Sequence, residues 1–302
     1  MTLDIPNSEI IVVDASSRDG TAEFLSGIKE IRFHPMLHKN TWAFNNELGI
    51  RLARGDWICI MNPDLYFDAN FNHLLAFLDS LHHSPYPMVA PQLIYPPGRK
   101  NREQWPIRNG LNLNGIFFTF ISTGHILDKK IARGYFARIR DPQRTYENMN
   151  GHEVWRVEHP IGSMFVVHRT TIEKLGGRLW QRGFTFAAAD SDMFRMARKK
   201  GIDIFVVPKA QVVHEAGHSA KSTPKPEMEY EFAYGLTLFT RYWSEHPRLL
   251  SILYLLDAVF SPISAVIGSR MRMTVEEFAG HIMNASSRLL GMIRAWKVRI
   301  DD

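Results

Sequence analysis

The sequence contains little that would point to a secreted or zinc-binding protein. Cys59 is the single cysteine among 302 residues, which excludes an internal disulfide and any zinc site built from cysteines. It lies in the apolar run WICIM, where we expect its side chain to be buried. The first residues, MTLDIPNSE, lack the basic and apolar regions of a secretory signal peptide, so we expect a cytoplasmic location.

Neither sign of charge is in large excess. The 36 Lys and Arg residues exceed the 31 Asp and Glu residues by a net charge of +5. This excess suits an anionic partner such as a nucleotide diphosphate or an acidic membrane surface, but it is too small to predict nucleic-acid binding. A Gly-rich phosphate loop is also absent after the first predicted strand, where the sequence reads ASSRDGT, and this disfavours a nucleotidyltransferase.

Short apolar runs alternate with helical patterns in the first part of the chain. Buried strands are predicted at Ile10–Val13, Trp57–Met61 and Met88–Leu93, and a helix is predicted at Thr41–Arg54. This alternation predicts an α/β sheet with functional groups at the carboxyl ends of its strands. Residues 95–155, rich in Pro, Gly, Arg and Asn, are expected to form an irregular lid or insert.

The pattern becomes helical in the last part of the chain. The apolar run Leu249–Ile267 approaches the length of a membrane span, but Asp257 and Pro262 interrupt it. We therefore expect this run either to lie in a membrane interface or to pack on the α/β domain, and the basic residues after it suit anionic lipid headgroups. The sequence predicts an α/β domain over residues 1–225 and a helical extension over residues 226–302.

Polar side chains stand where the predicted strands end. The Asp14 carboxylate could accept a hydrogen bond from a base or a ribose, or it could close an Asx turn. Asp64, in Asn62-Pro63-Asp64, could bind a divalent cation that carries a diphosphate, or it could be a simple turn residue. His214 ends a later extended run and could be a second ligand, although a single His is more often structural.

Two carboxylates, Asp190 and Asp192, open a predicted helix. Capping is one explanation, because the helix dipole favours an anion at this end. The other is a general base that takes the proton from an acceptor hydroxyl. Since the preceding GFTFAAA is small and apolar, we expect one of the two carboxylates to be desolvated, which raises its pKa.

Together these motifs resemble the family 2 glycosyltransferases with the GT-A fold, and especially the rhamnosyltransferase-like branch. The matching segments occur in family order: IIVVDASSRDGT, RLARGDW, ICIMNPD, IGSMFVVHRTTIEKLGG, AADSDMFRMARKKG and VVPKAQVVHEAGHS. Each motif is loose, but the ordered set is specific. The resemblance implies an α/β, Rossmann-like domain with a mixed sheet and a metal-dependent, inverting hexosyl or deoxyhexosyl transferase.

The resemblance also implies partners and site residues. The donor would be a dTDP- or UDP-linked sugar, with dTDP-rhamnose as the first expectation. The acceptor would be a saccharide or lipid-linked saccharide in cell-wall or surface-polysaccharide synthesis, at the inner face of the cell membrane. The implied site residues are the catalytic base Asp190, the donor contacts Asp14, Ser16, Asn46 and Asp64, the acceptor-side residues Gly162, Ser163 and Asp192, and the Mg²⁺ or Mn²⁺ ligands Asp64 and His214.

Three features depart from the family pattern. We expect the family's N-terminal strand and helix, which precede the Asp14 strand, to be missing. The usual Glu before the catalytic base is Ala189, and the metal motif keeps the single carboxylate of Asp64. The first two departures leave an alternative open, in which a degenerate GT-A protein acts as a binding or scaffold module without turnover.

Overall fold

The computed structural model describes two compact units. The described residues are 5, 7–83, 86–98, 103–104, 145–215, 223–268 and 273–300. Those of the first unit lie within 1–107, 144–180 and 193–216, and those of the second lie within 181–192 and 217–302. The predicted domain boundary at residue 225 stays a prediction, and each unit is described by itself.

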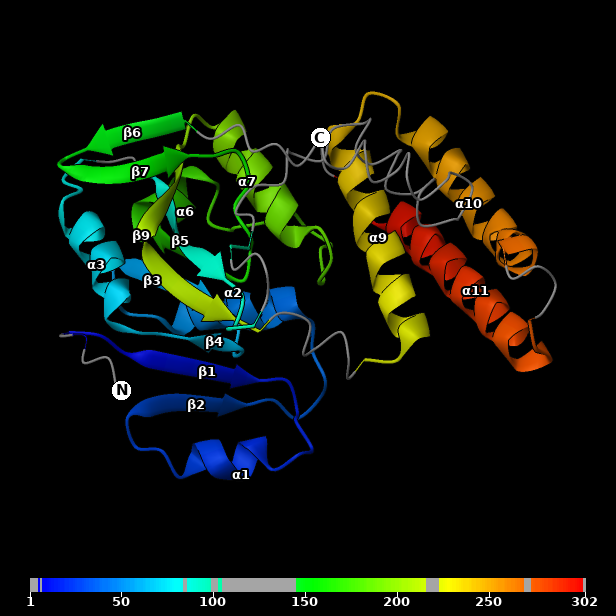
Figure 1. Ribbon diagram of the computed structural model, residues 1–302, viewed down its shortest axis with the longest axis horizontal. Helices are drawn as coiled ribbons and strands as arrows, with labels where there is room; N and C mark the ends of the chain where they lie inside the picture. Colours follow the sequence, from blue (N-terminus) through cyan, green and yellow to red (C-terminus); the bar gives the residue numbers. More distant parts are fainter. Residues whose placement is uncertain are drawn as a thin grey trace. The chain divides into compact units, whose positions relative to one another are not determined.

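The first unit is built on a seven-stranded mixed sheet (Figure 1). β5 and β9 are parallel, whereas β3 and β8 are antiparallel, as are β7 and β9. A separate sheet pairs two parallel strands, β1 (Ile10–Asp14) and β2 (Ile31–Pro35). The strands of the large sheet follow the order β3 (Trp57–Met61), β8 (Met164–His168), β5 (Met88–Ile94), β9 (Ile204–His214), β7 (His152–Arg156) and β6 (Thr145–Met149), with β4 (Leu65–Tyr66) paired to β9.

Side-chain hydrogen bonds cap the first turns of two of the helices. Thr41 accepts a hydrogen bond from the Phe44 amide and so caps the N-terminus of α2 (Trp42–Leu52), in agreement with the predicted helix. The described part of the second unit contains three long helices. One of them, α11 (Val275–Lys297), begins with a capping box, in which the side chains of Thr274 and Glu277 each accept a hydrogen bond from the other residue's backbone amide. The other helices are α1 (Thr21–Ser26), η1 (Ala69–Phe71), α3 (Asn72–Asp79), α6 (Arg169–Lys174), α7 (Ala189–Lys199), α9 (Lys225–Trp243), α10 (Pro247–Gly268) and α11 (Val275–Lys297).

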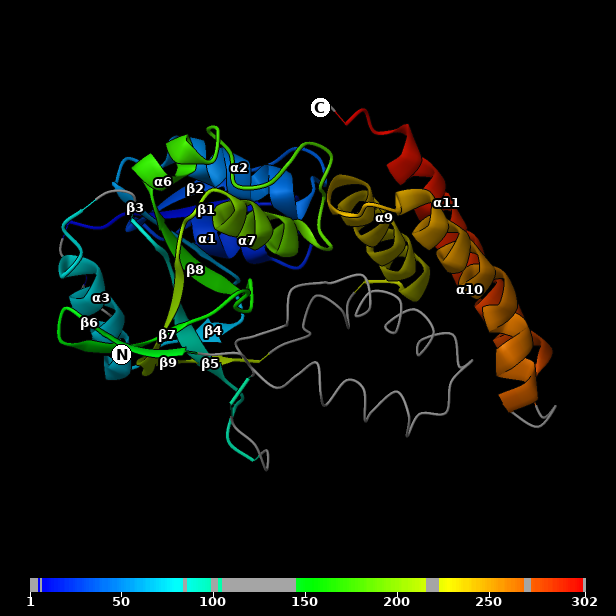
Figure 2. The same cartoon turned by 90° about the horizontal axis from the view of Figure 1, so that it is seen from above.

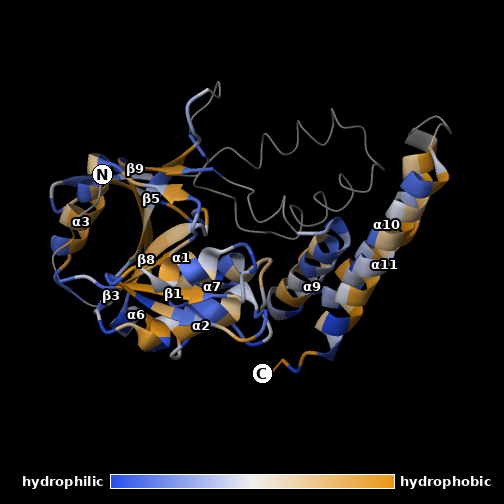
Figure 3. Ribbon diagram, turned by 90° about the horizontal axis from the view of Figure 1, so that it is seen from below, coloured by the Kyte–Doolittle hydropathy of each residue, from blue (hydrophilic) through white to orange (hydrophobic). Residues whose placement is uncertain are grey.

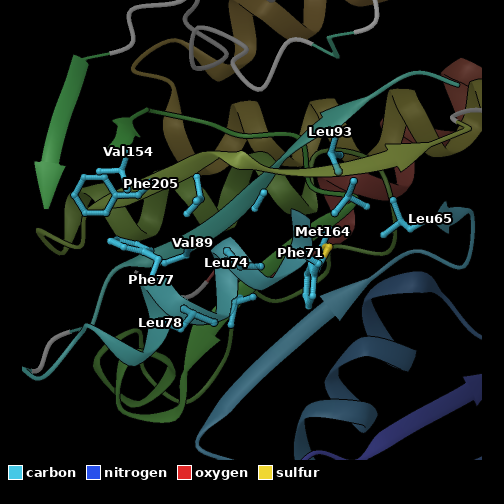
Figure 4. Packing of buried hydrophobic residues seen from close by; sticks show 14 residues of the cluster. Leu65, Phe71, Leu74, Phe77, Leu78, Val89, Leu93, Val154, Met164 and Phe205 are labelled. Atoms are coloured by element: carbon cyan, nitrogen blue, oxygen red, sulfur yellow. The ribbon is translucent and has the colours of Figure 1, made fainter. Parts of the chain in front are cut away.

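The main core lies between α3 and the large sheet (Figure 4). Leu74 and Phe77 of α3 are fully buried, because the apolar residues of this helix share one face. They join a cluster with inward residues of the five strands β4, β5, β7, β8 and β9, among them Val89, Val166 and Phe205. The cluster includes residues of β4 and β9, the two strands whose pairing places Asp64 beside His214, the last residue of β9.

Some sequence predictions need correction. Cys59 is exposed, because Ile58 and Ile60 take the buried face of β3 and leave the alternate positions on the other face. Residues 145–156, expected to be irregular, form the β6–β7 hairpin. The rest of the predicted lid, residues 105–144, lies outside the described residues.

The helices of the second unit form a hairpin with α9 packed against it. Figures 1 and 2 show α10 and α11 side by side, and Gly291 of α11 lets the backbone of α9 approach closely at Tyr230. In the part of the chain that the structure describes, no helix combines the length and apolarity needed to cross a bilayer. The prediction of a mixed α/β domain followed by a helical C-terminal region is confirmed.

Candidate functional site

Two predicted metal ligands meet in the first unit. β4 pairs antiparallel with β9 so that Leu65 lies opposite His214, which places the preceding Asp64 beside the histidine ring. Asp64 Oδ1 lies 3.5 Å from His214 Nε2, and their side chains are 16% and 8% exposed. The Glu215 amide also donates to the Asp64 carbonyl oxygen at 3.1 Å. Strand pairing therefore brings together a carboxylate and an imidazole that lie 150 residues apart.

Gln104 fixes the orientation of the histidine. Its Nε2 donates to the His214 carbonyl oxygen at 2.6 Å, and its Oε1 lies 2.7 Å from His214 Nδ1. Because a carboxamide oxygen only accepts hydrogen bonds, Nδ1 carries the proton and Nε2 presents its lone pair toward Asp64. Gln92 supports this arrangement by donating to the Gln104 carbonyl oxygen at 3.0 Å. Gln104 stands outside every motif recognised in the sequence and was not predicted.

The Asp64–His214 pair suits a divalent cation. Burial lowers the pKa of His214, against the opposing attraction of Asp64, so the ring is neutral at neutral pH and can bind a metal. Two ligand atoms held at about 2.1 Å from one cation stand no more than about 4 Å apart, which the observed separation satisfies. Among the described residues, no cluster of three or more His, Cys, Asp or Glu side chains could hold a metal. A cation here would take its other ligands from phosphates and water, as Mg²⁺ commonly does.

The predicted acceptor-side segment lies next to the metal motif. The Asn62 amide donates to the Ser163 carbonyl oxygen at 2.8 Å, as a continuation of the antiparallel pairing of β3 and β8. Ser163 is buried and Gly162 is half-buried. The structure therefore groups Gly162, Ser163 and Asp64 at one edge of the sheet.

Asp14 ends β1 with its carboxylate held by the following turn. The Ser17 amide donates to Asp14 Oδ2 at 2.9 Å, and the Ser17 hydroxyl donates to Oδ1. Ser16 takes a left-handed conformation, with φ of 67°, to make this Asx-type turn. The structural explanation for Asp14 thus holds, and the proposed contact with a nucleotide stays a prediction.

The two asparagines of α2 differ in their hydrogen bonding. Asn46, the predicted donor contact, uses its Nδ2 to bond the Trp42 carbonyl oxygen of its own helix at 2.9 Å. Asn45 Oδ1 is buried and has no hydrogen-bond partner among the described residues. An unsatisfied buried acceptor is costly, so Asn45 is the better-placed of the two to receive a hydrogen bond from a ligand.

Asp190 belongs to the second unit, where it stands in the first turn of α7. Its Oδ1 accepts from the Ser191 amide at 2.8 Å and from the Ser191 hydroxyl at 3.4 Å. The side chain is half-buried, and Ala188 just before the helix has φ of 61°, an uncommon conformation for a residue other than glycine. Local backbone strain of this kind is often found at functional sites.

Asp192 is the desolvated carboxylate of this segment. It is fully buried, and burial raises its pKa to about 6 against the lowering effect of three hydrogen bonds. The backbone amide of Gln181 donates to Asp192 Oδ2 at 2.7 Å, and its side-chain Nε2 donates to Oδ1 at 2.8 Å. Trp243 Nε1 also donates to Oδ1, at 2.7 Å. Asp192 therefore ties residues 181–192 to α9, and its predicted place on the acceptor side stays a prediction.

The Trp243→Phe variant is expected to lower the free energy of unfolding by about 1–3 kcal/mol, because a buried carboxylate loses one donor. The pKa of Asp192 in the folded protein is about 6, above its ordinary value of 3.8. Proton binding to Asp192 therefore stabilises the folded state. This contribution is complete below pH 3.8 and is lost as the pH rises through about 6. Since Trp243 favours the charged form, the loss should be larger at high pH than at low pH. Denaturant unfolding on both sides of that pKa measures it.

The matched control is Trp296→Phe, which removes a neutral hydrogen bond of 3.0 Å from Trp296 Nε1 to the Ser251 hydroxyl. The loss in the free energy of unfolding caused by Trp296→Phe should not change over the same pH range. Equal pH dependence in the two variants would contradict the role assigned to Asp192.

Residues 181–192 are held by α9 at several further points. The Tyr234 hydroxyl donates to the Gly183 carbonyl oxygen at 2.5 Å, and the Thr185 hydroxyl donates to Glu231 at 2.7 Å. Gly235 of α9 packs against the backbone of Ala187, where a Cβ would lie 2.7 Å from the Ala187 carbonyl carbon. The helical unit therefore shapes the segment that carries Asp190.

Comparisons with solved structures return glycosyltransferases at low identity. GalNAc-T7 with UDP, GalNAc and Mn²⁺ is 13% identical with a TM-score of 0.48, over 87% of this chain and 52% of that chain. Mannosyltransferase PcManGT from Pyrobaculum calidifontis, in complex with GDP-Man and Mn²⁺, is 13% identical with a TM-score of 0.43, over 96% and 78%. TarS from S. aureus is 12% identical with a TM-score of 0.44, over 95% and 48%. The chain thus spans about half the length of GalNAc-T7 and of TarS.

A family model gives a more decisive result. No curated protein matches the sequence at a significant level. The model described as Glycosyl transferase family 2 matches residues 2–176, which is more than half of the chain and includes the predicted metal ligand Asp64 and the Gly162-Ser163 segment. The predicted family is therefore confirmed: the chain belongs to glycosyl transferase family 2.

Proposed function

We propose that the protein is a metal-dependent, inverting glycosyltransferase that moves a sugar from a nucleotide diphosphate donor to a hydroxyl acceptor. The observation that carries this proposal is the Asp64–His214 pair, 3.5 Å apart, with the histidine lone pair directed at the carboxylate by Gln104. A carboxylate and a neutral imidazole are suitable ligands for Mg²⁺ or Mn²⁺. GalNAc-T7 and PcManGT were both solved with Mn²⁺ and a nucleotide or nucleotide sugar, which supports the same choice here.

The proposed roles follow from the chemistry of each side chain. A divalent cation at Asp64 and His214 would neutralise the diphosphate as it leaves the sugar. Asp190 would take the proton of the acceptor hydroxyl while that oxygen bonds to the anomeric carbon and the bond from carbon to diphosphate oxygen breaks. Attack from the face opposite the leaving group inverts the anomeric centre. Asp14 and Asn45 would contact the nucleoside.

The donor and acceptor are proposed by class. We assign the donor to dTDP- or UDP-linked hexoses or deoxyhexoses, with dTDP-rhamnose as the first to test, on the rhamnosyltransferase-like motifs ICIMNPD and AADSDMFRMARKKG. The acceptor is a saccharide or a lipid-linked saccharide used in cell-wall or surface-polysaccharide synthesis. A cytoplasmic enzyme at the inner face of the membrane fits such an acceptor.

Thermal unfolding with a panel of nucleoside diphosphates tests this proposal. UDP, dTDP and GDP are added with and without Mn²⁺, and we expect the preferred nucleotide to raise the melting temperature only when the metal is present. At a ligand concentration of about 100 Kd the gain is about 2.7 kcal/mol. In Asp64→Asn and His214→Ala the metal-dependent part of this gain should disappear.

Gln104→Ala extends the same measurement to the residue that orients His214. Both metal ligands remain, but the ring is free to turn, so the apparent affinity for Mn²⁺ should fall about 10- to 100-fold. Gln211→Ala is the control, because Gln211 is an exposed glutamine on β9, the strand that carries His214. Nucleotide binding that is independent of Mn²⁺ in the unaltered protein would reject the metal site.

A further inference from the structure

Helix α10 carries apolar side chains on two opposite sides. Leu250, Tyr254 and Ala258, spaced four residues apart, form its buried stripe. The opposite side of this helix is also apolar, whereas the outer face of a helix in a water-soluble bundle is normally polar. Its six most exposed apolar side chains, each 45–56% exposed, are Leu249, Ile252, Leu256, Val259, Phe260 and Ile263.

The apolar surface continues onto α11. A groove between the two helices is lined by Ile252 and Leu255 of α10 and by Leu289 and Ile293 of α11, so the exposed sides of both helices belong to one surface. Figure 3 shows hydrophobic segments on the pair of helices α10 and α11, which overlap in this view. We call this surface the hairpin face and define it as the six exposed residues of α10 with Phe278, Ile282, Leu290 and Ile293 of α11.

Basic residues border the hairpin face. Arg248 is exposed at the start of α10, and Lys297, at the end of α11, is exposed and lines the groove. The two helices are antiparallel neighbours in a hairpin, so these two cations stand at the same end.

We infer that the hairpin face docks on the surface of a lipid bilayer with anionic headgroups, where the two helices lie in the plane of the interface. An interfacial helix buries its apolar side among the acyl chains and keeps Lys and Arg among the headgroups, and the hairpin has both features. The cations decide between lipid and a second copy of the chain, because they match an anionic surface. This inference stands apart from the proposed chemistry, but it would bring the enzyme to acceptors carried on lipid.

Vesicle flotation tests the inference. The full chain is mixed with vesicles of phosphatidylcholine alone or of phosphatidylcholine with phosphatidylglycerol, and we expect stronger binding to the anionic vesicles. The double variant Ile252→Glu with Val259→Glu should bind at least about tenfold more weakly to both, because it places charge in the apolar layer. The control, Phe24→Glu with Leu37→Glu, adds the same charge at residues that are 71% and 90% exposed in the first unit, and should bind normally.

A second variant tests the charges without altering the apolar residues. Arg248→Gln with Lys297→Gln should weaken binding to the anionic vesicles by about 30-fold at low salt and leave binding to phosphatidylcholine unchanged. The inference is overturned if the unaltered protein does not float with anionic vesicles. It is equally overturned if sedimentation shows a dimer that the Ile252 and Val259 substitutions dissociate while vesicle binding stays the same. Because this assay contains no donor, acceptor or metal, its result is independent of the proposed activity.

Discussion

Replacement of Asp190 by Asn is expected to slow sugar transfer by about 10²- to 10⁴-fold, because the amide cannot take the proton of the acceptor hydroxyl. The change keeps the shape of the side chain and its hydrogen bond from the Ser191 amide. Stabilisation by nucleotide and Mn²⁺ should therefore be unchanged, since Asp64 and His214 remain. The measurement is release of nucleoside diphosphate from a panel of dTDP-, UDP- and GDP-sugars with saccharide acceptors, under single-turnover conditions.

Asp79→Asn is the matched control. It replaces a carboxylate by an amide in the same way, but Asp79 is exposed at the end of α3 and belongs to none of the family motifs. Equal transfer rates in the Asp190 variant and the unaltered enzyme would reject Asp190 as the base. If neither protein turns over any donor while nucleotide and Mn²⁺ still bind, the alternative of a degenerate binding module gains support. Ala189, in place of the family's Glu, is the residue that makes this outcome worth testing.

The largest effect on stability is expected from Gly235→Ala in α9. A Cβ at this position would lie 2.7 Å from the carbonyl carbon of Ala187 and 3.0 Å from its Cβ. The clash is with backbone, which cannot rotate away, so α9 and the Asp190 segment must separate. We expect a loss of roughly 3 kcal/mol in the free energy of unfolding, at the upper end of the range for overpacking, and a fall in transfer activity with it. Denaturant unfolding measures the first effect.

Gly280→Ala provides the comparison within the same unit. Gly280 lies in the interior of α11, and a Cβ there would meet no atom within 4 Å. Alanine should therefore stabilise the protein by up to about 1 kcal/mol, because it favours helix more than glycine does. If the two variants have the same free energy of unfolding, the protein does not have the close contact between Gly235 and the backbone of Ala187.

Sequence periodicity located the elements with strong apolar patterns and missed those without them. β3 and β5 are short apolar runs between turn signals, and both were predicted within two residues of their observed ends. The β6–β7 hairpin was missed because β6, with the sequence TYENM, is an edge strand with no buried residue. A strand whose faces are both largely solvated carries no alternating apolar signal.

The candidate site was predictable where a motif ended a strand. Asp64 and His214 were paired from their places after β3 and in β9, and the structure brings them within 3.5 Å. Gln104 could not be predicted, because its role depends on a hydrogen bond to a residue 110 positions away. The sequence did predict that Asp190 or Asp192 is desolvated, but it could not predict the hydrogen bond from Trp243, which lies 51 residues from Asp192.

The attachment of residues 181–192 to α9 limits how the C-terminal region can be exchanged. A chimera that joined this α/β domain to the helices of another glycosyltransferase would replace Trp243, Tyr234 and Gly235 together. Asp192 would then lose the hydrogen bond from Trp243 and keep only those from Gln181, and the Gly183 carbonyl oxygen would lose the hydrogen bond from Tyr234. We expect residues 181–192, which carry Asp190, to lose their position in such a chimera. A successful exchange needs residues 181–192 and α9 to be transferred together from the same protein.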